Sequence, residues 1–147
     1  EYDNNEIEIK IIRNVSSNDK PKSKPSKNIL VLEDHIDWGK MIKRRAENEG
    51  HKVTVTSTVD EFNKILKKKG KSFDIISLDN QIDGKNVAQD VSIEIKYYAP
   101  DTHVGLISSR FDEPERGRFQ DLAFEFILKK SGRKLNWEEF FAWVSTV

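Results

Sequence analysis

From Asn28 to the end of the chain, short apolar runs alternate with amphipathic segments, and this alternation constrains the fold most strongly. The five apolar runs are 28–32, 52–57, 73–78, 103–107 and 126–128. Parallel strands need long, usually helical, crossovers, so strands that alternate with helices predict a parallel sheet with right-handed connections. Three of the runs, 28–32, 73–78 and 103–107, are apolar without alternation, as in strands buried on both faces. The sequence therefore predicts a three-layer α/β domain.

Several of the amphipathic segments carry their own start or stop signals. Thr58 and Glu61 form a capping-box pair before one helix, and Asn136 with Glu139 forms another. Gly50 stands where a glycine commonly ends a helix. The helices are expected at about 37–50, 58–70, 87–98, 113–124 and from 136 onward.

Composition narrows the class of protein. The 147 residues suit one domain. With 25 basic and 25 acidic side chains, no net charge draws the chain to nucleic acid or to a membrane surface, and direct binding to either is not expected. The absence of cysteine excludes disulfides and thiolate metal sites. No apolar stretch approaches the roughly 20 residues that span a bilayer. We expect a soluble, cytoplasmic protein.

The first 27 residues differ from the rest. Residues 6–12 alternate with the period of a strand, whereas residues 16–27 contain no apolar side chain and are typical of a linker. We therefore divide the chain into an N-terminal extension and linker (1–27), with a possible extra strand at 6–12, and a folded domain (28–147). Because the given sequence begins at Glu1 and shows no secretion signal, we expect it to be a piece of a longer protein.

Polar side chains follow four of the five expected strands. Glu33 and Asp34 follow the first strand, Asp79 the third, Ser108 the fourth, and Lys129 with Lys130 the fifth. Ligands of open parallel sheets bind beyond the carboxyl ends of the strands, where the strand order reverses. If the first and third strands are neighbours there, three carboxylates meet a hydroxyl and an ammonium group. Such a set suits Mg²⁺ together with a phosphate.

These residues stand in segments that resemble a known family. "ILVLED" at 29–34, "DIISLD" at 74–79, "VGLISS" at 104–109 and "EFILKK" at 125–130, with the intervals between them, resemble the receiver domain of response regulators in two-component signalling. The resemblance runs from Asn28 to the end of the chain. It implies a flavodoxin-like receiver fold whose five-stranded parallel sheet has the order 2-1-3-4-5.

The resemblance also implies roles for individual residues. Asp79 would accept a phosphoryl group from a phosphohistidine, Lys129 would pair with the phosphoryl oxygens, and Ser108 would hydrogen-bond one of them. The implied ligands of Mg²⁺ are Glu33, Asp34, Asp79 and the carbonyl of Gln81. The partners would be a histidine kinase or histidine phosphotransfer protein, and a downstream protein or a preceding domain, with a dimer possible. Such a domain signals and is not an enzyme beyond self-phosphotransfer and slow autodephosphorylation.

Two segments depart from the family pattern. After Asp79 the family has methionine and proline at the third and fourth positions and glycine at the eighth, where this chain has Ile82, Asp83 and Val87, with a glycine at Gly84. An altered loop and an additional negative charge near the metal follow from this difference.

The second departure follows the site lysine. The family lysine precedes a cis proline, whereas Lys129 precedes Lys130. A cis bond before a residue other than proline costs about 2.5–4 kcal/mol, so we expect a trans bond. Because adjacent strand residues face opposite sides, Lys130 is an alternative to Lys129. The spacing favours Lys129.

Two other functions fit parts of the pattern. A pseudo-receiver with the same fold would act only as a protein interaction module, and the altered loop and missing proline favour it. A Mg²⁺-dependent phosphohydrolase or nucleic-acid-cleaving domain on a similar sheet would use acids after the first and third strands. It generally needs two acids one residue apart, however, and "DNQ" at 79–81 lacks the second. Trp38 falls in a helical pattern, which is typical of a packing residue.

Overall fold

A five-stranded parallel sheet forms the middle layer of the molecule. The structure is a computed structural model, and it describes residues 25–109, 124–132 and 134–147. The sheet strands are β1 (Asn28–Leu32), β2 (Lys52–Thr56), β3 (Ile75–Leu78), β6 (His103–Ser108) and β7 (Phe126–Lys129). Their order is β2-β1-β3-β6-β7 and every pair is parallel. Counted along the chain, this is the predicted order 2-1-3-4-5, so the expected three-layer α/β fold is confirmed.

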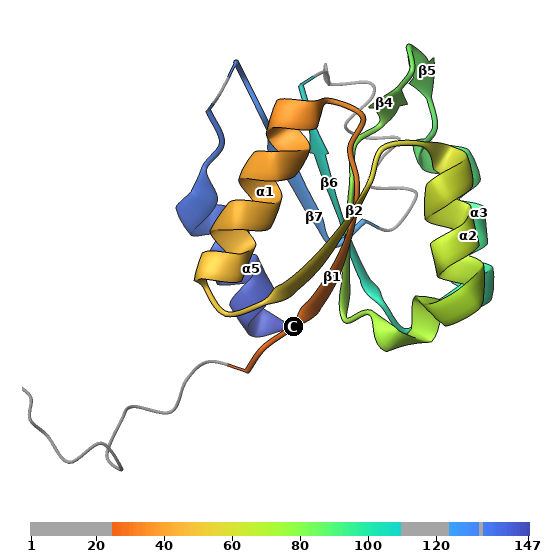
Figure 1. The fold of residues 1–147 in the computed structure, drawn as a ribbon, viewed down its shortest axis with the longest axis horizontal. Coiled ribbons are helices and arrows are strands. Elements are labelled where there is room, and N and C mark those ends of the chain that lie inside the picture. Colours follow the sequence, from red (N-terminus) through yellow and green to blue (C-terminus); the bar gives the residue numbers. More distant parts are fainter. Residues whose placement is uncertain (1–24, 110–123, 133) are drawn as a thin grey trace, which may run out of the picture.

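Helices cover both faces of the sheet (Figure 1). They are α1 (Ile36–Asn48) and α5 (Trp137–Thr146) on one face, and α2 (Val59–Lys69), the short 3₁₀ turn η2 (Gly70–Ser72) and α3 (Ala88–Tyr98) on the other. Thr58 and Asn136 cap α2 and α5 through their side chains, as the capping pairs predict. None of the helices in the described ranges is long and apolar enough to cross a membrane.

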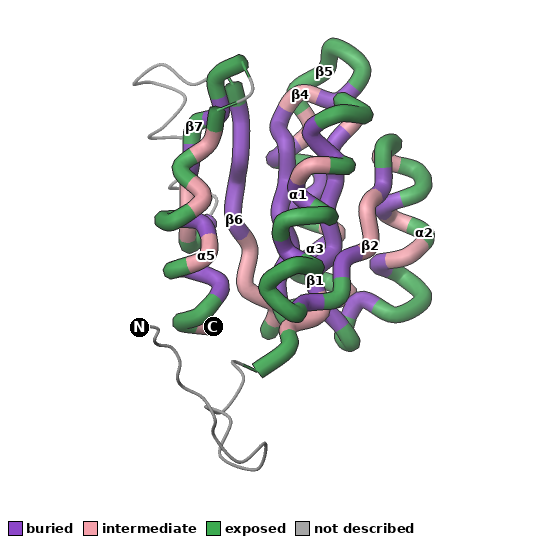
Figure 2. The backbone as a smooth tube through the Cα atoms, turned by 60° about the vertical axis from the view of Figure 1, so that its left-hand side comes forward, coloured by how far each residue is buried: buried purple, intermediate pink, exposed green. Residues whose placement is uncertain are grey.

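The core has two halves, one on each side of the sheet. Leu30 and Leu32 of β1 pack toward α2 and α3, whereas Ile29 and Val31 pack toward α1 and α5. All four are essentially inaccessible to solvent. A strand that is buried on both faces has no polar side to alternate with, which explains the unbroken apolar run. Buried residues concentrate in the strands, while the helices also present exposed positions (Figure 2).

The loop after Asp79 contains a small β-hairpin that the sequence analysis did not predict. Its strands are β4 (Gln81–Ile82) and β5 (Lys85–Asn86), and they pair antiparallel. The two turn residues, Asp83 and Gly84, have φ of 53° and 74°. Asp-Gly with positive φ at both positions is the preferred chemistry of a two-residue type I′ turn. The predicted alteration of this loop is therefore a hairpin at the carboxyl edge of the sheet (Figure 1).

Two predicted elements lie largely or wholly outside the described residues. They are the possible strand at 6–12, and the helix at 113–124, of which only Phe124 is described. The fourth sheet strand, β6, extends one residue beyond its predicted end and includes Ser108. Ser108 is consequently a strand residue with a buried side chain rather than the first residue of a loop.

Candidate functional site

The carboxyl ends of β1 and β3 bring three acids together. Leu32 pairs with Leu78 in the sheet, so the residues that follow, Glu33 and Asp79, adjoin. The backbone N–H of Asp79 donates to the carbonyl of Leu32 at 2.9 Å, which continues the pairing to the acidic residue. One carboxylate oxygen from each of Glu33, Asp34 and Asp79 lies within 4.8 Å of the others. We call these three residues the acidic cluster.

The lysine at the acidic cluster is Lys130, not the predicted Lys129. The Nζ of Lys130 forms an ion pair with Oε1 of Glu33 and lies 3.1 Å from Oδ2 of Asp79. Lys130 is only 4% exposed, whereas Lys129 is open to solvent.

Strand pairing explains this one-residue shift. Lys129 is the last residue of β7 and pairs with Ser108. The backbone N–H of Lys130 then donates to the carbonyl of Ser108 at 3.0 Å. Because adjacent residues of an extended chain face opposite ways, only one of the two lysines can reach the cluster. The peptide bond between them is trans, as expected.

The main chain at Gln81 also lies beside the cluster. Its N–H donates to Oδ1 of Asp79 at 3.3 Å, so each oxygen of the Asp79 carboxylate has a partner. Asn80, which the sequence analysis did not single out, is buried and accepts the N–H of Ala88 at 2.9 Å through Oδ1. This bond ties the start of α3 to the residue that follows the candidate phosphoacceptor.

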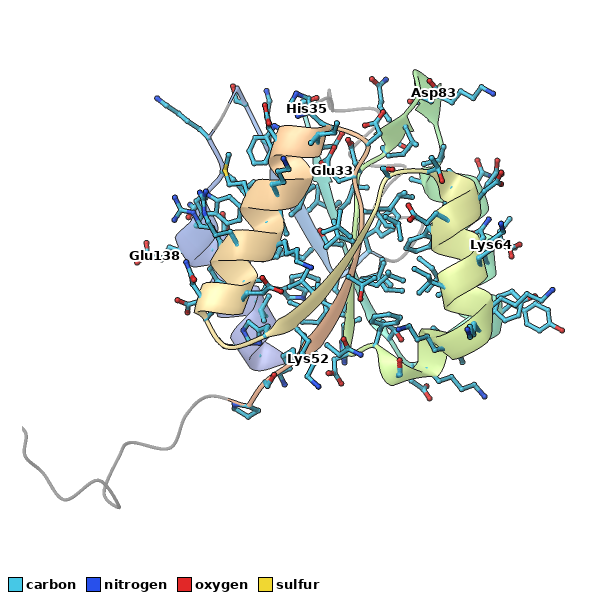
Figure 3. All side chains as sticks on the ribbon, in the orientation of Figure 1. Glu33, His35, Lys52, Lys64, Asp83 and Glu138 are labelled. Atoms are coloured by element: carbon cyan, nitrogen blue, oxygen red, sulfur yellow. The ribbon has the colours of Figure 1, made fainter. Side chains whose placement is uncertain are left out.

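The hairpin contacts the partly exposed member of the cluster. The backbone N–H of Asp83 donates to Oδ2 of Asp34 at 2.8 Å. Glu33, His35 and Asp83 lie at the same end of the molecule (Figure 3). Asp83 was expected only as an additional negative charge near the metal. Its main-chain N–H instead gives Asp34 a hydrogen-bond donor.

Glu33 lies in an unfavourable electrostatic environment for a carboxylate. Burial, together with repulsion from Asp79, raises its pKa to about 7, against the opposing attraction of Lys130. The backbone N–H of His35 donates to its second oxygen, Oε2, at 3.1 Å. Burial is the largest cause of the raised pKa, and the Lys130 ammonium group offsets only part of it.

This donor set fits a divalent cation. Three carboxylates and one ammonium group leave a formal charge of two negative units when all are ionised, which a divalent ion would cancel. All candidate donors are oxygens, which hard cations such as Mg²⁺ and Ca²⁺ prefer. Glu33, Asp34 and Asp79 are the residues that would hold the ion.

Trp38 is a site neighbour that the sequence analysis assigned to packing. The Nζ of Lys130 lies 5.3 Å from the centroid of the Trp38 ring. Trp38 belongs to α1 and is 6% exposed. Its helical spacing is what a core residue would show, so the sequence alone gave no signal that the ring faces the site lysine.

Comparisons with known proteins show the fold. No protein-family model and no curated protein matches the chain. Among solved structures, the HemR receiver domain of Leptospira biflexa is 21% identical with a TM-score of 0.70, and the match covers 82% of this chain and 93% of that one.

Two further similar structures are of response regulator proteins that contain ligands or a modified residue. TrrA of Thermotoga maritima, in complex with Mg²⁺-BeF, is 22% identical with a TM-score of 0.66, covering 82% of this chain and 97% of that one. A Burkholderia pseudomallei response regulator with a phosphorylated aspartic acid, calcium ion and citrate is 19% identical with a TM-score of 0.69, covering 80% and 65%. The resemblance to receiver domains is confirmed for the fold.

Proposed function

We propose that this chain is a receiver domain that accepts a phosphoryl group onto Asp79 from a phosphohistidine, with Mg²⁺ bound at the acidic cluster. The observation that carries the proposal is the meeting of Glu33, Asp34, Asp79 and Lys130 at one edge of the sheet. Phosphoryl transfer needs in-line positioning and charge neutralisation more than covalent assistance, and the Lys130 ammonium group with a bound cation would supply the charge neutralisation.

In the proposed step, a carboxylate oxygen of Asp79 attacks the phosphorus atom. The bond between phosphorus and the donor imidazole breaks, and its electron pair stays on the imidazole nitrogen. The product is an aspartyl phosphate, a recognised covalent intermediate. The bound divalent ion would supply charge neutralisation at the phosphoryl oxygens.

The chain's own residues divide the remaining work. Glu33 and Asp34 would hold the metal, together with Asp79 and, as the resemblance implies, the carbonyl of Gln81. The Lys130 ammonium already bonds Oδ2 of Asp79, so it stands within reach of a phosphoryl group on that residue. Ser108 would report the phosphorylated state from the end of the neighbouring strand. The named ligands of the Thermotoga and Burkholderia structures support a divalent metal and an acyl phosphate on this fold.

The proposed partners follow from this chemistry. A histidine kinase or a histidine phosphotransfer protein would donate the phosphoryl group. A downstream protein, or a domain preceding this one, would read the change of surface. We propose a signalling role in the cytoplasm, with self-phosphotransfer and slow autodephosphorylation as the chemistry of the domain itself.

One observation favours a second candidate, a pseudo-receiver that acts only as an interaction module. Each acid of the cluster already has a partner within the protein: Lys130 pairs with Glu33 and Asp79, and Asp83 donates to Asp34. A cluster satisfied in this way would hold the fold together without an ion or a phosphate.

A labelling experiment separates the two candidates. The protein is incubated with Mg²⁺ and a small phosphodonor such as acetyl phosphate, and its intact mass is measured. We expect one added phosphoryl group on the wild type and none on Asp79→Asn. Absence of labelling in the wild type would favour the pseudo-receiver.

A further inference from the structure

We propose that Trp38 is a positioning residue for the phosphoryl transfer, because its ring holds the Lys130 ammonium group in place at the acidic cluster. The inference rests on the proposed function, since it assigns a task to Lys130 in that reaction. The contact joins Trp38 of α1 to Lys130, the residue that follows β7.

The contact is formed between two buried groups. The ammonium nitrogen of Lys130 lies 5.3 Å from the Trp38 ring centroid, inside the range in which a cation is attracted to the face of an aromatic ring. Trp38 is 6% exposed and Lys130 4% exposed. With little water between them, the attraction is stronger than at an exposed site.

The main chain turns at the residues that follow Lys130. Ser131 and Lys134 exchange two backbone hydrogen bonds of 2.9 and 2.8 Å, so the chain turns away directly after the lysine. Gly132 has a φ of 60° within this turn. The four-carbon stem of a lysine is flexible, and its ammonium group is directed only by what surrounds it. Among the described residues, the carboxylates of Glu33 and Asp79 and the indole ring of Trp38 lie against this ammonium group.

The ring itself is held by two helices. Trp38 lies in the first turn of α1, and its backbone N–H donates to Nδ1 of the N-cap residue His35 at 3.5 Å. The ring of Trp137, in α5, lies 6.4 Å from that of Trp38, centroid to centroid, with the rings tilted by 35°. The Trp38 ring is therefore buried between α1 and α5, and a packed ring can restrict a flexible cation.

A neutral aromatic face suits this task because it adds no charge to the site. A third carboxylate beside Lys130 would attract the ammonium away from the phosphoryl oxygens, whereas a ring attracts the cation weakly and over a broad face. When Asp79 carries a phosphoryl group, the ammonium can turn toward the new oxygens and stay over the ring. Loss of the ring would leave Lys130 in many orientations and slow the transfer.

A double-mutant cycle on the full chain tests the assignment. The variants are Trp38→Leu, Lys130→Met and the double variant, with Trp38→Phe as the conservative change. Phe62→Leu is the matched control, since it removes a fully buried ring on the opposite face of the sheet. For each variant, the rate constant of labelling by acetyl phosphate is measured at saturating Mg²⁺, with the Mg²⁺ dissociation constant and the unfolding curve.

We expect Trp38→Leu to slow labelling roughly tenfold and Trp38→Phe by less than about threefold, within the range of a buried cation–π contact. Added to Lys130→Met, Trp38→Leu should have almost no further effect, because the ring acts only through the lysine. The Mg²⁺ dissociation constant of Trp38→Leu should stay within about twofold of the wild-type value, because the ring carries no charge. Phe62→Leu should slow labelling by less than Trp38→Leu.

Other results would overturn the assignment. If Trp38→Leu slows labelling by the same factor with and without Lys130, the ring has only a structural role. Trp38→Phe and Trp38→Tyr allow the same comparison if the leucine variant does not fold. Absence of labelling in the wild type would overturn the proposed function as well, so the two failures are distinguishable.

Discussion

The surroundings of Glu33 oppose the ionisation of its carboxyl group. It is 3% exposed, its near neighbour Asp79 carries the same charge, and its pKa is raised to about 7. An unfolded chain would return this carboxyl to its ordinary value of 4.5. The folded protein therefore binds more protons than the unfolded chain between these two values. The contribution to stability is fully present below the lower pKa and is lost as the pH rises through the upper one.

The raised pKa of Glu33 leads to a prediction for the stability of the metal-free protein. Its free energy of unfolding should decrease between pH 6 and pH 8 by more in the wild type than in Glu33→Gln, which cannot ionise. Urea unfolding at several pH values in the presence of a chelator measures the difference. Equal pH dependence in the two proteins would show that Glu33 does not titrate in this range.

The two adjacent lysines should differ sharply. Removing one partner of a buried ion pair costs about 3–5 kcal/mol, because the other charge stays buried, so Lys130→Met should destabilise the protein by roughly this amount. Lys129 is exposed, and Lys129→Met should change stability by less than about 0.5 kcal/mol. Chemical denaturation of both variants measures the contrast. If Lys129→Met destabilised the protein more than Lys130→Met, Lys129 would be the lysine of the site.

At the scale of elements, the apolar pattern of the sequence predicted the strands of the sheet. It did not predict the residue at which each strand ends. The unbroken run at 28–32 identified β1, and the acids after it were placed correctly beside those after β3. Which of two adjacent lysines faces the site depends on the residue at which β7 ends, and hydrophobicity does not encode that. The Asp83-Gly84 pair is typical of a two-residue hairpin turn, and the structure has a hairpin there. The sequence analysis considered only the methionine, proline and glycine of the family that this loop lacks.

The packing of α5 on β6 gives a prediction at this scale. A Cβ atom at Gly105 would lie 2.7 Å from Cη2 and 2.9 Å from Cζ3 of the Trp143 ring. Gly105→Ala should therefore displace α5 and destabilise the protein by about 1–3 kcal/mol. Trp143→Phe removes the outer ring atoms, so the double variant should recover part of the loss caused by Gly105→Ala alone. Urea denaturation measures the free energy of unfolding of each variant. If the losses caused by Gly105→Ala and Trp143→Phe simply add in the double variant, this packing is contradicted.

At the scale of the whole molecule, the order β2-β1-β3 reverses the direction of winding between β1 and β3, and open sheets bind ligands at such a point. The acidic cluster lies there, with α1 starting three residues after Glu33 and the hairpin on its other side. The same location is what the sequence predicted from polar residues after strands. The fold could be derived from pattern, whereas the contact of Trp38 with Lys130 required three-dimensional packing.

A ligand that binds only the folded state stabilises it. Millimolar Mg²⁺ should therefore raise the melting temperature of the wild type, by an amount that grows with the metal concentration. Asp34→Asn and Asp79→Asn should lose most of this rise, because each removes a carboxylate from the cluster. Sodium chloride of equal ionic strength is the control for general screening. An equal rise with sodium chloride would argue against a specific divalent site.

The central claim is that one defined carboxylate accepts the phosphoryl group, and borohydride trapping tests it most directly. After incubation with acetyl phosphate and Mg²⁺, borohydride reduces an acyl phosphate to the alcohol, which converts the modified aspartate to homoserine. Peptide mass spectrometry then locates the change. We predict homoserine at position 79 in the wild type, and none without Mg²⁺. Reduction at another carboxylate, or at none while the donor is consumed, would contradict the account.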